Sequence, residues 1–86
     1  MAKGTWAATE ADSEVLAADA SRTAVEFQHT SGTPIYLAFG EAAVFGEGML
    51  LRSVMPYYQV TDSRAALAIH MICDTGLVAG GGYQTT

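Results

Sequence analysis

Apolar and polar residues alternate along much of the chain from Val15 onward, which is the period of a β-strand with one buried face. The alternation is clearest at residues 23–29 and 35–39, and residues 30–34 between them are rich in turn formers. We therefore expect these two strands to pair as a β-hairpin. The side chains expected to face the core from this hairpin are Val25, Phe27, Ile35, Leu37 and Phe39.

The rest of the sequence also predicts short strands separated by turns. Further strands are expected at residues 49–52, 56–60, 66–73 and 77–83, with turns at 61–64 and 74–76. Residues 40–48 fit either a loop or one helical turn, and their glycines favour the loop. Because no amphipathic helix is visible, we expect an all-β fold, a small antiparallel β-sandwich or barrel of about six to eight short strands.

The N-terminal residues differ from the rest of the chain. Residues 1–13 follow neither the helix nor the strand period and contain one large apolar side chain, Trp6. We therefore expect an N-terminal arm at 1–13 and a β-sandwich domain at 14–86. Trp6 would anchor the arm on a neighbouring molecule, since tryptophan is enriched at interface hot spots. The alternative is that the arm lies on its own domain as an edge strand.

The predicted strand at 67–73 is apolar on both faces. Its two faces carry Leu67, Ile69, Met71 and Cys73 on one side and Ala68, His70 and Ile72 on the other. A two-layer domain of this size has one interior, so the second face is covered either by the domain's own loops or by another protein. A body this small without disulfides also has little core of its own, which favours association.

Charge and composition exclude several classes of partner. The chain has 86 residues, 15% of them charged, and a net charge near −5, with only four Lys or Arg residues. Nucleic acids and anionic membranes bind through basic residues, so neither is an expected partner. No apolar stretch reaches the ~20 residues of a membrane span, and no signal peptide is visible. We expect a protein made in the cytoplasm, and its single Cys73 allows no intrachain disulfide.

The sequence contains no pattern typical of catalysis or metal binding. His70 and Cys73 lie three apart on a strand, hence on opposite faces, and cannot share one metal ion or proton. The glycine runs at 46–48 and 80–82 lack the Lys and Ser/Thr that follow a phosphate-binding loop. We therefore expect no enzymatic activity, no catalytic residues, no metal and no cofactor.

Two adjacent tyrosines, Tyr57 and Tyr58, face opposite sides of a predicted strand. One is expected in the core and one exposed, where it either stacks on a sugar, fills an interface or covers the rim of the core. The candidate interface residues are Trp6, Tyr57, Tyr58 and His70.

Residues 15–51 resemble a group of small bacteriophage proteins. The resemblance is carried by the segments VLAA, SRTAV, QHTS, PIYLAFGE and GEGMLL. In that group an Arg precedes a strand, a Gln-x-x-Ser segment leads to a second strand ending in Phe-Gly, and a Gly-x-Gly segment enters the next strand. The second half of the chain departs from the pattern: residues 53–56 stand where the group has a Pro-Gly turn, and residues 66–70 replace a Gly-Ala-Ile-Tyr-Ala strand.

The resemblance implies a non-enzymatic virion structural protein of the capsid decoration, cement or head-fibre-base type. Such a protein would bind the capsid exterior and reinforce capsomer junctions after assembly in the host bacterial cytoplasm. Its implied partners are the major capsid protein and copies of itself, as a homotrimer. Two alternatives stay open: an adhesion domain of a head fibre or tail that contacts host glycans through Tyr57 or Tyr58, and a head–tail connector or stopper.

Overall fold

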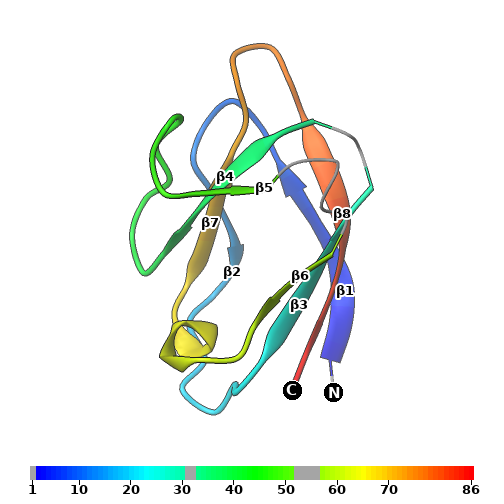
Figure 1. Cartoon of the computed structure of the whole chain (residues 1–86), viewed down its shortest axis with the longest axis vertical. Helices are drawn as coiled ribbons and strands as arrows, with labels where there is room; N and C mark the ends of the chain where they lie inside the picture. Colours follow the sequence, from blue (N-terminus) through cyan, green and yellow to red (C-terminus); the bar gives the residue numbers. More distant parts are fainter. Residues whose placement is uncertain (1, 31–32, 52–56) are drawn as a thin grey trace.

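Eight strands form two antiparallel four-stranded sheets in the computed structural model, which describes residues 2–30, 33–51 and 57–86. Sheet A has the order β1 (Ala2–Ala8), β8 (Ala79–Thr85), β3 (Val25–His29) and β6 (Tyr57–Val60). Sheet B has the order β2 (Ser13–Leu16), β7 (Ile69–Ile72), β4 (Ile35–Phe39) and β5 (Met49–Leu51). The two sheets face each other as layers (Figure 1), so the predicted small β-sandwich is confirmed.

The core lies between the sheets and follows the alternation read from the sequence. Each strand turns every second side chain inward, and the largest inward side chains have no contact with solvent. The side chains with less than 2% exposure are Phe27, Ile35, Leu37, Leu51, Ile69, Met71, Val25, Val60 and Cys73. Cys73 is buried, while His70 lies on the outer face of sheet B beside two acidic residues. Their predicted placement on opposite faces is therefore confirmed.

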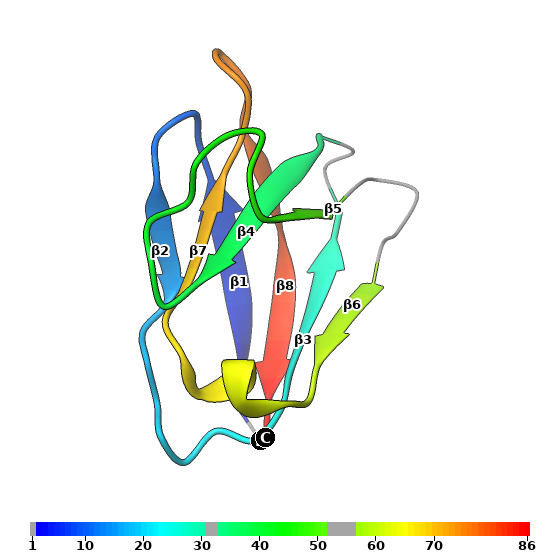
Figure 2. The same cartoon turned by 60° about the vertical axis from the view of Figure 1, so that its left-hand side comes forward.

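The predicted hairpin between residues 23–29 and 35–39 is wrong. Both segments are strands, but β3 pairs with β6 and β8 in sheet A, whereas β4 pairs with β5 and β7 in sheet B. β3 and β4 therefore lie in different layers of the sandwich, as Figure 2 shows. Two strands on opposite sides of one core have the same alternation as two strands in one sheet, so periodicity alone does not distinguish these arrangements. Part of the predicted turn at 30–34 and the first residue of the strand predicted at 56–60 lie outside the described residues.

Residues 2–8 are part of the sandwich and not a separate arm. They form β1, which pairs with β8 along its whole length, from Ala2 opposite Thr85 to Ala8 opposite Ala79. Trp6 is 4% exposed and belongs to the core cluster. The prediction of an arm at 1–13 is therefore wrong for this segment, and the alternative of an edge strand on the same domain describes it.

A short 3-10 helix replaces the beginning of the strand predicted at 66–73. Helix η1 (Ser63–Ala66) starts at Asp62, whose side chain accepts the backbone N–H of Arg64 at 2.9 Å. β7 therefore begins only at Ile69, and Leu67 is exposed instead of facing the core. The predicted loop at 40–48 is confirmed, because Gly40, Gly46 and Gly48 adopt positive φ angles that favour glycine.

Candidate functional site

Trp6 lies inside the domain, in the core between the two sheets. Its indole N–H lies 3.2 Å from the backbone carbonyl oxygen of Gln28 and 3.1 Å from that of Gly82, and donates to both. Its ring meets the His29 ring edge to face, with centroids 5.7 Å apart. A buried indole with its N–H satisfied is a core residue. The structure therefore contradicts the prediction that Trp6 is an exposed anchor for a neighbouring molecule.

Glycines lie opposite the aromatic residues of β1 and β8 and leave space for their rings. Trp6 lies opposite Gly81, and Tyr83 lies opposite Gly4. A Cβ atom on Gly4 would lie 2.9 Å from the Tyr83 hydroxyl oxygen, which is too close for a side chain. Each aromatic ring therefore occupies the space left by a glycine on the facing strand. The sequence did not predict these contacts, because they depend on which residues face each other across β1 and β8.

The two tyrosines of β6 have different positions in the sheet. Tyr58 lies opposite Phe27 of β3 and packs, partly buried, against the core. Tyr57 lies opposite Gln28 in the register, and its side chain is outside the described residues. Tyr58 therefore supports the rim of the core, which was the structural alternative considered for it.

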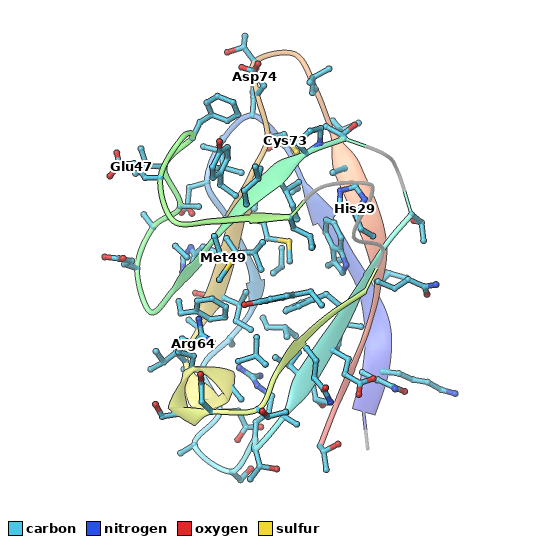
Figure 3. All side chains as sticks on the ribbon, viewed as in Figure 1. His29, Glu47, Met49, Arg64, Cys73 and Asp74 are labelled. Carbon is cyan, nitrogen blue, oxygen red and sulfur yellow. The ribbon has the colours of Figure 1, made fainter. Side chains whose placement is uncertain are left out.

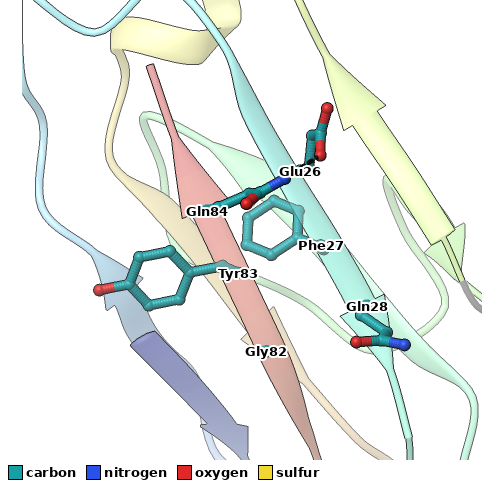
Figure 4. A pocket seen from close by; sticks show the side chains of 6 residues that line it. All are labelled: Glu26, Phe27, Gln28, Gly82, Tyr83 and Gln84. Atoms are coloured by element: carbon teal, nitrogen blue, oxygen red, sulfur yellow. Dashed lines mark hydrogen bonds between the residues drawn. The ribbon is translucent and has the colours of Figure 1, made fainter. Parts of the chain in front are cut away.

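A shallow depression of about 320 Å³ lies on sheet A between β3 and β8 (Figure 4). The carboxylate of Glu26 accepts hydrogen bonds from two amide groups, that of Gln59 at 3.0 Å and that of Gln84 at 2.7 Å. Gly82 leaves space beside them, and Gln28 closes the next position along β3. This arrangement offers fixed donors and acceptors on a flat surface, which suits a ligand with several hydroxyl groups.

The row of polar side chains along this depression, which we call the polar row, could not be located from the sequence. Glu26 and Gln28 were visible as the polar face of a strand, but Gln84 joins them only because β8 lies beside β3. A Gln at the end of a glycine-rich strand does not by itself indicate a binding site, because its neighbours become known only with the strand order.

His70 belongs to a second polar cluster, on the outer face of sheet B. Its Nδ1 atom lies 3.0 Å from an Asp12 carboxylate oxygen, and its Nε2 atom lies 3.8 Å from Glu14. The same Asp12 oxygen accepts the backbone N–H of Ala43 at 2.7 Å. The Ala43 hydrogen bond, followed by the His70 contact, lowers the pKa of Asp12.

This cluster fastens the loop at 40–48 to sheet B. Ala43 is buried there, and the Phe45 ring meets the Tyr36 ring edge to face at 5.1 Å. The side chain of His70 is 16% exposed, which leaves it little free surface for a partner. On this part of β7 the domain's own loop covers the outer face, which was one of the two alternatives for it.

Arg22 is a buried cation that sequence reasoning did not single out. It is 8% exposed, and its guanidinium donates to the backbone carbonyl oxygens of Ala17, Ala65 and Leu67. These contacts connect the segment after β2 to η1 and the start of β7. Arg22 therefore stabilises the fold, and its buried guanidinium is not accessible to a ligand.

The end of the sandwich away from both chain termini carries exposed apolar side chains. The β7–β8 loop at 73–78 forms this end, where Figure 3 places Asp74, opposite η1, and the loop at 40–48 runs along the outer face of sheet B toward it (Figures 1 and 2). The large apolar residues that these two loops expose are Val44, Phe45, Leu77 and Val78. We call these four residues the distal surface.

Comparison with protein-family models, curated proteins and solved structures finds no match for this chain. Within the described ranges, His, Cys, Asp and Glu residues form no group of three or more that could hold a metal ion. No helix in the described part of the chain is long and apolar enough to cross a membrane.

Proposed function

We propose that the chain is a non-enzymatic structural protein of a bacteriophage virion, which binds the capsid exterior and reinforces the junctions between capsomers. The sequence support is the resemblance of residues 15–51 to small phage proteins. The single structural observation that carries the proposal is the distal surface, where two loops of a small domain expose four large apolar side chains. The proposed partners are the major capsid protein and further copies of this chain.

The distal surface is held in place before any partner binds. Val78 is 68% exposed and Leu77 is 45% exposed, on a loop whose Gly76 N–H donates to the Glu10 side chain at 2.6 Å. The neighbouring loop is fixed by the Phe45–Tyr36 contact described above. A surface whose loops are already ordered loses less conformational entropy on binding, which favours a permanent contact.

The proposal is tested by sedimenting the purified chain with capsids that lack it. Val78→Asp places a charge in the distal surface, so we expect its binding to be reduced at least tenfold, since central apolar contacts contribute most of the binding energy. The matched control is Ser63→Asp, which adds the same charge on exposed η1 at the other end of the sandwich. No sedimentation of the unmodified chain, or equal loss in both variants, would count against the proposal.

A glycan-binding adhesion domain is a second candidate, favoured by the depression beside Glu26. Its row of amide and carboxylate groups matches the hydroxyl groups of a sugar. A glycan array probed with the purified chain distinguishes the two functions. Saturable sugar binding that Gln84→Ala removes and Gln59→Ala weakens supports adhesion, and an array without signal leaves capsid binding as the proposal.

A further inference from the structure

Among the edge strands in the described residues, β1 is the longest. It spans seven residues in regular register with β8, and no described strand lies on its other side. Within residues 2–30, 33–51 and 57–86, the other edge strands β6 and β2 have four residues each and β5 has three, and β2 also contains a register shift between Glu14 and Leu16. Short strands, bulges and charged edge residues are the usual means by which proteins prevent edge-to-edge pairing. β1 is neither short nor bulged, and Lys3 is its one charged residue.

The free peptide groups of β1 face outward in a regular row. The carbonyl oxygens of Gly4 and Trp6 lie on the β8 side, 3.6 and 3.4 Å from the positions that Cβ atoms of Gly82 and Gly80 would take. Peptide groups alternate in direction along an antiparallel strand, so those of Lys3, Thr5 and Ala7 point away from β8. These positions form a template for an additional antiparallel strand.

We propose that this edge pairs with β1 of a second copy of the chain, so that two copies of sheet A join into one continuous sheet. The strand is complementary to itself about its midpoint, Thr5. Full overlap places Thr5 opposite Thr5 of the second copy and Lys3 opposite Ala7 of the second copy. Inward residues stay inward on both copies, because directly opposite residues share a face.

Charge also favours this strand as its own partner. Lys3 is the only charged residue in β1, and in this register it meets a small neutral residue. The chain as a whole carries a net charge of −5, and an edge without acidic residues adds no local repulsion between acidic groups of two copies. The inference stands on the sheet edge and does not depend on the proposed function. It replaces the homotrimer implied by the resemblance with a two-fold dimer.

The test is light scattering of the full chain during size-exclusion chromatography over a range of concentrations. We expect a species of twice the 9.0 kDa chain mass that dissociates on dilution. Thr5→Pro removes an outward N–H without removing a bond to β8, and we expect it to be monomeric. Thr5→Val keeps the N–H and should dimerise like the unmodified chain. Circular dichroism and the fluorescence of the single tryptophan check that each variant is folded.

The register is tested with a charge pair at the exposed position 7. Ala7→Lys faces Lys3 of the second copy and should raise the dimer dissociation constant about threefold to tenfold, while Ala7→Glu should lower it by a similar factor. Adding Lys3→Glu to Ala7→Lys should restore the original affinity. A monomeric or trimeric unmodified chain, a folded Thr5→Pro dimer, or equal effects of Ala7→Lys and Ala7→Glu would each overturn the inference.

Discussion

Trp6 and Gly81 face each other across β1 and β8, and the indole occupies the space that a side chain on Gly81 would need. A Cβ atom at Gly81 would lie 2.9 Å from the indole nitrogen and 1.8 Å from the Gln28 carbonyl oxygen, which accepts the indole N–H. The packing of Trp6 against Gly81 thus adds a side-chain contact to the backbone pairing that joins β1 to β8.

Gly81→Ala should destabilise the domain by about 1–3 kcal/mol, because the new methyl group has to displace Trp6 or the backbone of β3. Gly82→Ala is the matched control, since its Cβ would lie 3.6 Å from the nearest atom and its φ angle is compatible with alanine. We expect its effect to be within about 0.5 kcal/mol. Urea unfolding followed by tryptophan fluorescence measures both. Equal stability of the two variants would contradict the role of Gly81.

Arg22→Lys should cost about 1–3 kcal/mol of stability, because an ammonium group cannot reach the three carbonyl oxygens that the guanidinium connects. Arg64→Lys is the control on the surface, where the charge pairs with Asp62 in solvent, and should change stability little. Thermal unfolding compares the two. A larger loss for Arg64→Lys than for Arg22→Lys would show that the buried contacts contribute less than we infer.

The hydrogen bonds to Asp12 predict a pH dependence of stability. The Ala43 N–H and His70 hold the pKa of Asp12 below its ordinary value of 3.8, so the unfolded chain takes up the proton more readily. This stabilisation is present above about pH 4 and is lost as the pH falls through the folded-state pKa. The stability difference between the unmodified chain and Asp12→Asn should therefore shrink between pH 6 and pH 3. Glu47→Gln, on the exposed loop, is the control, and a constant difference for Asp12→Asn would refute the assignment.

The buried thiol of Cys73 should be unreactive in the native domain. Burial raises its pKa, which lowers the thiolate fraction, and 1% of the residue is accessible. Labelling with a disulfide reagent at pH 8 should be slow in buffer and should accelerate in urea in step with unfolding. Rapid labelling in buffer, at the rate of a free thiol, would mean that this side of the core opens on its own.

From residue 23 onward the sequence predicted strands β3 to β8 and most of the side chains that they bury, because alternation depends only on local geometry. Val25, Phe27, Ile35 and Leu37 lie where that period places them. Strand pairing was not predictable in the same way. Whether β3 and β4 form one hairpin or face each other across the core depends on connections that periodicity does not encode.

β1 escaped prediction because only one of its inward positions, Trp6, carries a large apolar side chain. Gly4, Trp6 and Ala8 show a strand period only when the facing strand supplies the ring of Tyr83 and the space at Gly81. The polar row at Glu26 depends in the same way on two strands meeting. The alternation within one strand could be recognised in the sequence. Contacts between side chains of two neighbouring strands could not, because they depend on the strand order.

The central claim, a virion protein on the capsid exterior, is tested most directly by counting this chain in purified phage particles. Quantitative mass spectrometry against the major capsid protein gives the ratio of the two proteins. The account predicts many copies per particle, in fixed proportion to the capsid protein, and their loss in particles that carry Val78→Asp. Absence of the chain from particles, or only the few copies that one vertex or tail can hold, would contradict it.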